Sequence, residues 1–278
     1  MIITTDDIWI HNTWVGFLDY LSPLKSELKL KILLSLLKGE RKIADLRADV
    51  ESRDTTILHV LEEFGDLDLT TKSQGVYRLS SLGLFETKIL KDFISTIEVI
   101  EKFKDFWLLH NVADIPSHLL LNIGALSDAL LVRTDATELD IVHTKILEIL
   151  KTSKKVRGIS PVFHRDYVPV VERLLKEGNS VELIFSSKVL NRTLTSAETG
   201  LIKKYIQEGK LKISLNENVK IALTVSENSF SMGLFKLNGE YDYGADLISL
   251  NQEAIEWGEH LFEDVVKVST RIGLESLT

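Results

Sequence analysis

The sequence predicts two domains of mixed helix and sheet, an α+β module followed by a larger α/β domain, with a long helix between them. The chain has 278 residues, which is enough for more than one hydrophobic core. Apolar residues recur at helical spacing through much of residues 22–110, whereas strand-like and helix-like segments alternate after residue 111. We therefore expect domains at residues 1–80 and 111–278, linked by residues 81–110.

The composition is that of a soluble globular protein, with 44% hydrophobic and 27% charged residues. The absence of cysteine excludes disulfides, zinc-thiolate sites and cysteine nucleophiles. Asp6 and Asp7 stand where a secretory signal would be basic, and no apolar run reaches the roughly 18 residues needed to span a bilayer. We expect a cytoplasmic protein that does not contact a membrane.

Residues 22–80 predict three helices followed by a hairpin, after an N-terminal extension. The first helix should start at Ser22-Pro23 and end near Gly39. A short second helix covers residues 41–50, and Ser52 is the expected N-cap of the third. Residues 67–81 then alternate apolar and polar, with Ser73-Gln74-Gly75 as the turn. This order is that of a winged helix-turn-helix.

A winged helix-turn-helix binds double-stranded DNA by placing its third helix in the major groove, so that residues near the helix start meet the bases. Arg53 is suited to guanine or phosphate, and the neighbouring hydroxyls are suited to phosphates. Lysine and arginine equal aspartate and glutamate in number within residues 22–80, so the net charge of −8 lies elsewhere. Asp54 shares this face and would repel phosphate, and a solvated face without DNA remains the alternative. The DNA-contact candidates are Lys42, Arg47, Ser52, Arg53, Thr55, Thr56, His59, Lys72, Ser73, Gln74 and Arg78.

Residues 81–110 predict one long amphipathic helix. Its apolar residues recur at steps of three and four: Phe85, Ile89, Phe93, Ile97, Ile100, Phe103 and Trp107. Such a stripe packs either on the chain's own second domain or on a second copy of the chain. We expect it to serve a homodimer.

The α/β domain is predicted from its alternating segments. Residues 119–126 and 129–134 precede a helix at 137–153. The expected strands that follow are 156–160, 181–187, 212–215, 219–226 and 229–237, and the further helices are 167–178, 194–209 and 250–272. The last two strands should be neighbours joined by Glu227-Asn228. Strand–helix alternation is typical of a mainly parallel sheet covered by helices.

Polar residues follow two of these strands, RGISPVFHRDY at 157–167 and VELIFSS at 181–187. Open α/β sheets bind ligands beyond the carboxyl ends of their strands, so we expect a pocket for a small-molecule effector there. The candidate lining residues are Ser160, His164, Tyr167, Ser186 and Ser187, with Tyr241, Tyr243 and Asp246 closing the opposite side.

His164 has three interpretations: a general base, a hydrogen-bonding group for a ligand, or a structural residue at a helix start. The sequence contains no G-x-S-x-G elbow, no glycine-rich phosphate loop and no H-E-x-x-H or H-x-x-x-H spacing. We therefore expect no enzyme activity, no cofactor and no metal.

The block Gly158–His164, together with Gly-Leu-Phe at 233–235 and Tyr-Asp-Tyr at 241–243, resembles the archaeal methanogenesis regulatory family of transcription regulators. The resemblance runs from about Ser22 to Val268. It implies an N-terminal winged helix, an α/β effector domain and a role in transcriptional control.

The order of the α/β domain is also similar to the phospholipase D-like domain of archaeal sugar-responsive regulators. Active phospholipase D domains carry H-x-K on a strand. The corresponding residues 219–233 include Lys220 but no histidine, so the resemblance implies sensing rather than hydrolysis.

Three functions remain open from the sequence. The first is a ligand-responsive, DNA-binding transcription regulator. The second is a degenerate or unrecognised hydrolase-like domain with a winged-helix interaction module. The third is an adaptor whose winged helix binds protein instead of DNA.

Overall fold

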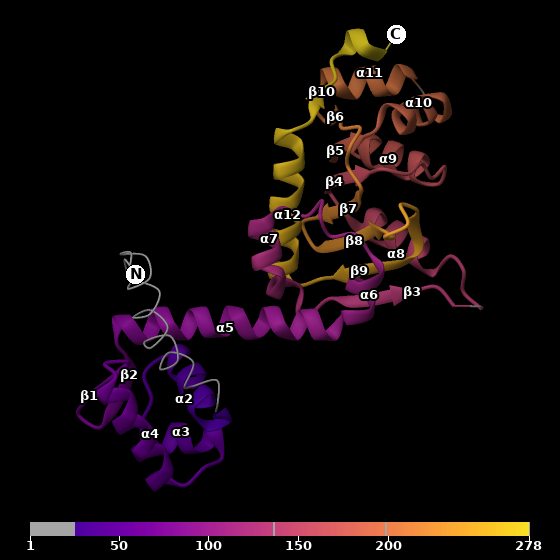
Figure 1. The fold of residues 1–278 in the computed structure, drawn as a ribbon. Helices are drawn as coiled ribbons and strands as arrows, with labels where there is room; N and C mark the ends of the chain where they lie inside the picture. Colours follow the sequence, from indigo (N-terminus) through magenta and orange to yellow (C-terminus); the bar gives the residue numbers. More distant parts are fainter. Residues whose placement is uncertain (1–25, 136, 198, 278) are drawn as a thin grey trace, which may run out of the picture. The chain divides into compact units, whose positions relative to one another are not determined.

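The structure is a computed structural model that describes residues 26–135, 137–197 and 199–277. The chain divides into two compact units, one ending at Ile94 and the other beginning at Ser95 (Figure 1). The division falls inside a long helix and not at either of its ends. The N-terminal extension and the helix start expected at Ser22-Pro23 lie outside the described residues.

The first unit consists of three helices and a hairpin, in the predicted order. Its elements are α2 (Glu27–Leu37), α3 (Ile43–Val50), α4 (Asp54–Asp66), β1 (Thr70–Ser73) and β2 (Val76–Leu79). The helices enclose one core in which Ile32, Leu46, Ile57 and Phe64 are buried. Each fully buried apolar side chain contributes about 1.5–3 kcal/mol to the stability of the fold. This contribution holds the three short helices together.

Local backbone geometry explains where these elements begin and turn. The side chain of Ser26 caps α2 by accepting the Lys29 N–H at 3.4 Å. The N-cap of α4 is Arg53, not Ser52, because Glu51 takes a left-handed conformation after α3 and the chain extends through Arg53. Gln74 and Gly75 have φ of 50° and 79°, which is the geometry of a two-residue hairpin turn. The predicted turn is therefore present.

The predicted linker helix is two helices, α5 (Ser81–Lys102) and α6 (Lys104–Leu109), separated at Phe103. Leu90 packs into the core of the first unit, and Val99 and Phe103 pack into the core of the second. The predicted apolar stripe is divided too. Its first five members are exposed, whereas Phe103 is buried and Trp107 packs against the core of the second unit.

The second unit is built on an eight-stranded sheet in the order β10-β6-β5-β4-β7-β8-β9-β3. The strands are β3 (Leu130–Arg133), β4 (Lys155–Ser160), β5 (Ser180–Phe185), β6 (Leu211–Leu215), β7 (Ile221–Ser226), β8 (Ser229–Phe235), β9 (Tyr241–Ser249) and β10 (Thr270–Arg271). Only β4–β5 and β5–β6 are parallel pairs among the described strands. The prediction of a mainly parallel sheet is wrong, because hairpins join β7 to β8 and β8 to β9 and reverse the chain each time.

Helices cover both faces of this sheet (Figure 1). They are α7 (Ser117–Leu121), α8 (Ile141–Thr152), α9 (Tyr167–Lys176), α10 (Ser187–Ser196), α11 (Thr199–Gln207) and α12 (Gln252–Lys267), with 3₁₀ turns η2 (Ile123–Leu126) and η3 (Leu274–Leu277). Residues 119–126, which precede the helix expected at 137–153, include the end of α7 and the turn η2. The strand expected at 181–187 ends at Phe185, and β9 was not predicted.

Strand periodicity separates two cores. Ile159, Ile184, Leu223 and Met232 belong to the cluster that packs with α7 and α12. The alternate residues of β4, β5 and β6 pack with α9, α10 and α11 in a second cluster. Among the described residues, no helix combines the length and the apolar character needed to cross a membrane.

Candidate functional site

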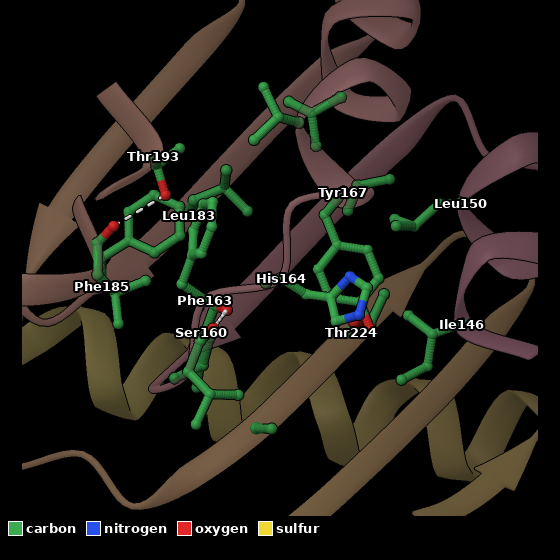
Figure 2. Close-up of a pocket in the computed structure, with 18 of the residues that line it drawn as sticks. Ile146, Leu150, Ser160, Phe163, His164, Tyr167, Leu183, Phe185, Thr193 and Thr224 are labelled. Atoms are coloured by element: carbon green, nitrogen blue, oxygen red, sulfur yellow. Dashed lines mark hydrogen bonds between the residues drawn. The ribbon is translucent and has the colours of Figure 1, made fainter. Parts of the chain in front are cut away.

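A cavity of about 240 Å³ lies in the second unit, between the sheet and helices α8 to α11 (Figure 2). Its walls are mostly aliphatic and aromatic, as is usual for small-molecule sites. Leu183 and Phe185 line it from β5, Ile146 and Leu150 from α8, and Leu190 from α10. The site therefore belongs to one unit alone.

The cavity exists because the strands beneath it carry small side chains. Gly158, Ala222, Thr224 and Ser231 line it from β4, β7 and β8. A Cβ atom at Gly158 would lie only 2.9 Å from Leu183 Cδ2. On the opposite face the same strands carry Ile, Leu, Val, Phe and Met, which fill that core. Small residues toward one helical layer leave a space that no side chain occupies.

One end of the cavity is polar. Asp246 on β9 is 1% exposed, and its Oδ2 accepts the Ser231 hydroxyl at 2.7 Å. Its Oδ1 has no hydrogen-bond partner among the described residues. Burial raises the pKa of Asp246 to about 7, although the Ser231 hydrogen bond acts in the opposite direction. A carboxyl group with one unpaired oxygen is costly in an apolar interior unless something binds it.

Two phenols lie near this carboxyl group. Burial, followed by the charge of Asp246, raises the pKa of both Tyr167 and Tyr241 above the ordinary tyrosine value. A Cβ atom at Gly233 would meet both Tyr241 OH and Asp246 Oδ1 at 2.5 Å, so both groups lie over that glycine. The two phenols are therefore neutral groups that can donate or accept hydrogen bonds.

A histidine pair stands beside Tyr167. The rings of His143 and His164 have centroids 3.6 Å apart. His143 Nδ1 lies 3.1 Å from Tyr167 OH, and His143 Nε2 lies 3.3 Å from Asp166 Oδ2. The Asp166 backbone N–H donates to His164 Nδ1 at 3.3 Å. Burial, and then the neighbouring His143, lowers the pKa of His164.

His143, His164 and Asp166 are also the described residues that could hold a metal ion, since one ligand atom of each lies within 4.8 Å of the others. Two imidazoles and a carboxylate suit several transition metals. However, Asp166 is exposed, and His164 Nδ1 already accepts a backbone N–H. Hydrogen bonds within the chain thus account for much of this arrangement.

The structure brings most of the predicted effector-site residues together. Six line the cavity: Ser160, His164, Tyr167, Tyr241, Tyr243 and Asp246. Ser186 and Ser187 do not, because the strand ends before them and they begin α10. Ser186 caps that helix by accepting the Val189 N–H at 3.4 Å, and the Ser187 N–H donates to Glu217 Oε1 at 2.9 Å.

Six polar lining residues were missed: Asp140, His143, Glu172, Thr193, Thr224 and Ser231. His143 had a detectable signal, because it stands three residues before Ile146 and seven before Leu150, which is the spacing of one face of α8. Ser231 stands in SFSMG, where small and large residues alternate. This alternation predicts a strand with small side chains on one face, which leaves room for a cavity there. The proximity of Ser231 to Asp246 depends on the pairing of β8 with β9, which periodicity does not reveal.

The DNA-contact candidates lie on the surface of the first unit. Thr55, Thr56 and His59 are exposed on α4, opposite buried Ile57. Arg53 is exposed at the start of α4, with no ion pair among the described residues, whereas Ser52 is half-buried. The hairpin residues Lys72, Ser73, Gln74 and Arg78 are exposed, as are Lys42 and Arg47.

Some of these cations already have partners. Arg47 pairs with Asp54 at 3.3 Å, and Arg78 pairs with Glu40 at 3.7 Å. The Lys72 ammonium lies 5.1 Å from the centre of the Tyr77 ring. Exposed pairs of this kind contribute only about 0–1 kcal/mol, so they are easily exchanged for phosphate contacts.

Comparison with known proteins identifies the family. Residues 22–98 match the N-terminal domain of methanogenesis regulatory protein FilR1, and residues 140–267 match its middle domain. The chain belongs to the methanogenesis regulatory protein family. Methanogenesis regulatory protein FilR1 of Methanothrix harundinacea (strain 6Ac) is 32% identical over 261 residues, which are 91% of this chain and 58% of that protein. The chain thus spans less than two thirds of its FilR1 relative.

Solved structures are more distant from this FilR1-family chain. TrmBL2, an archaeal chromatin protein with a novel mode of DNA binding, is 12% identical, with coverage of 91% of this chain and 99% of TrmBL2 and a TM-score of 0.43. The phospholipase D family member Nuc of Salmonella typhimurium is 13% identical, with coverage of 52% and 97% and a TM-score of 0.36. An O-methyltransferase family protein of Burkholderia thailandensis is 9% identical, with coverage of 78% and 65% and a TM-score of 0.26. TM-scores this low support no functional argument.

Proposed function

We propose that this protein is a transcription regulator that binds duplex DNA through a winged helix-turn-helix and binds a small-molecule effector in its α/β domain. The observation that carries the DNA-binding part is the exposed polar face of α4, with Arg53 at its start and Lys72 and Arg78 on the hairpin. Membership of a family named for regulation supports the same role.

The α/β domain has the features of a sensor. Its cavity is formed, mainly apolar and equipped with a few converging polar groups. An unpaired polar group in such a cavity can bind a ligand, and a ligand shifts a protein toward whichever of its states binds that ligand better. Asp246 is such a group.

A hydrolase-like domain is the second candidate, favoured by the contacts of His143 with Tyr167 and Asp166. Hydrolysis through a covalent intermediate would need a nucleophile beside that histidine. Ser160 carries a hydroxyl and lines the cavity, but that hydroxyl donates to Val162 O at 2.7 Å. The described hydrogen bonds thus assign Ser160 to its own loop, and we favour effector binding.

The test is a selection of genomic fragments by the full chain, followed by sequencing and by fluorescence anisotropy on the enriched duplex. Enrichment of one motif, lost when Arg53, Lys72 and Arg78 are replaced by alanine, is the expected result. A selection that enriches nothing, with a folded protein and a positive control, contradicts DNA recognition and favours the adaptor.

A further inference from the structure

The cavity has two chemically different ends. In Figure 2, Leu183, Phe185 and Thr193 lie on one side, and His164, Tyr167 and Thr224 lie on the other, with Ile146 and Leu150 of α8 beyond them. The first end continues into aliphatic residues of α10 and α11, such as Leu190, Leu194 and Ile202. A ligand that occupies both ends must be mostly apolar, with its polar group at one terminus.

The charge of the lining restricts that polar group. No lysine or arginine contributes to the cavity wall among the described residues. Burial lowers the pKa of His164, which disfavours an imidazolium beside the cavity. A ligand carboxylate or phosphate would therefore enter a site with no permanent cation and with Asp246 at its polar end. Above the Asp246 pKa of about 7, where this carboxyl group is ionised, burial of an uncompensated anion beside it is strongly unfavourable.

The hydrogen-bonding capacity of the wall points to a donor. Asp246 Oδ2 is already bonded to Ser231, and Asp246 Oδ1 is buried without a partner. This oxygen and the Tyr241 hydroxyl lie over Gly233, where no side chain separates them. An N–H or O–H group arriving here would satisfy an acceptor that the protein leaves open.

We propose that the effector is an elongated, largely aliphatic molecule that ends in a hydrogen-bond donor, an O–H or N–H group, and that this donor binds Asp246 Oδ1. The proposal rests on the effector-binding role given to the cavity above. It excludes fatty carboxylates and phosphorylated compounds as preferred ligands.

The test uses three probes that share one eight-carbon chain: octan-1-ol, octanamide and octanoate. The affinity of each probe is measured by its displacement of the neutral fluorophore N-phenyl-1-naphthylamine from the full chain. The measurement is made at pH 8, where the Asp246 carboxyl group is ionised. A hydrogen bond to a charged acceptor is worth about 1.5–3 kcal/mol, so the alcohol and the amide should bind roughly 10- to 100-fold more tightly than octanoate.

Variants assign this preference to one residue. Asp246→Asn keeps the shape of the side chain and offers an amide to a carboxylate, so the preference should shrink to within about threefold. Asp105→Asn is the matched control, because the same substitution removes an exposed carboxylate of α6 that does not line the cavity. This control should keep the full preference.

The possible outcomes distinguish the preference for a hydrogen-bond donor from the effector-binding role of the cavity. If octanoate binds as tightly as octan-1-ol to the wild type, the donor inference is wrong while the cavity remains a binding site. If Asp246→Asn keeps the wild-type preference, Asp246 is not the acceptor. If the fluorophore and all three probes fail to bind, the effector-binding role itself fails. The wild-type comparison decides the first point even if Asp246→Asn does not fold.

Discussion

At the residue scale, Asp246 is the group whose behaviour is most constrained by its surroundings. It is buried, carries one unpaired oxygen and has a pKa raised to about 7 from 3.8. A raised carboxyl pKa means that folding favours the protonated form. The contribution of the protonated Asp246 to the free energy of unfolding is therefore fully present below about pH 4. It is lost as the pH rises through about 7.

We predict that Asp246→Asn removes this loss. Relative to the wild type, the variant should gain stability between pH 4.5 and pH 8, by on the order of 3 kcal/mol. Denaturant unfolding of both proteins at the two pH values measures the gain. An equal difference between variant and wild type at both values would show that Asp246 ionises freely in the folded state.

Arg53, Lys72 and Arg78 are expected to differ in what they do on DNA. Arg53→Ala should cost about 1–3 kcal/mol on the preferred duplex and relax base preference at one position, because Arg53 stands at the start of α4. Lys72→Ala and Arg78→Ala should weaken binding to all sequences and reduce the salt slope by about 1 each.

The matched control for these variants is Arg173→Ala, which removes a partly exposed arginine of α9 that pairs with Glu177. Anisotropy titrations at several salt concentrations distinguish the effects. A triple variant of Arg53, Lys72 and Arg78 that keeps full affinity and specificity would move the DNA site elsewhere.

At the element scale, α5 presents an apolar face that the described residues leave uncovered. Phe85, Ile89 and Phe93 are 70%, 67% and 51% exposed, and Ile97 and Ile100 continue the face. Residues at steps of three and four lie on one side of a helix, so these five form a single seam. Seams of this kind are typical of helices that pair.

We predict that two copies of the chain pair through this seam. Phe93→Glu with Ile97→Glu places two charges in it and should convert a dimer to a monomer at tens of micromolar, as measured by light scattering. Lys91→Glu, at another exposed position of α5, should leave the dimer intact. A wild-type protein that is monomeric both free and on DNA would refute the homodimer. A dimer that survives the double variant would show that the dimer interface is not this seam.

Periodicity predicted the elements better than their pairing. The hairpin at Gln74-Gly75 and the neighbours β7 and β8 were readable, because local turn chemistry fixes them. The direction of most strands was not readable, because it depends on which elements pair at long range. β9 was missed since YDYGADLIS contains Asp and Gly, which are poor strand formers, and pairing with β8 and β3 compensates.

The candidate site shows the same limit. Ser160, His164 and Tyr167 were found from polar residues after a strand, and they do line the cavity. The same reasoning failed at Ser186, because a helix starts there and uses its hydroxyl as a cap. Side-chain burial at Asp246 could not be foreseen, although its position was named.

At the scale of the whole molecule, α5 contributes to the cores of both units, with Leu90 in the first and Val99 in the second. The proposed DNA site and the proposed effector site belong to different units. A regulator of this kind requires that binding at one site change the affinity at the other, and such coupling is reciprocal.

The most direct test is the affinity of the selected duplex with and without a saturating metabolite, found by a thermal-shift screen on the wild type. Typical coupling predicts a change of about 5- to 150-fold. The same change in metabolite affinity should appear when DNA is present, and both changes should vanish in a His164→Ala, Tyr167→Phe variant that still binds the duplex. A metabolite that occupies the cavity while the affinity for the duplex stays the same would contradict a ligand-responsive regulator.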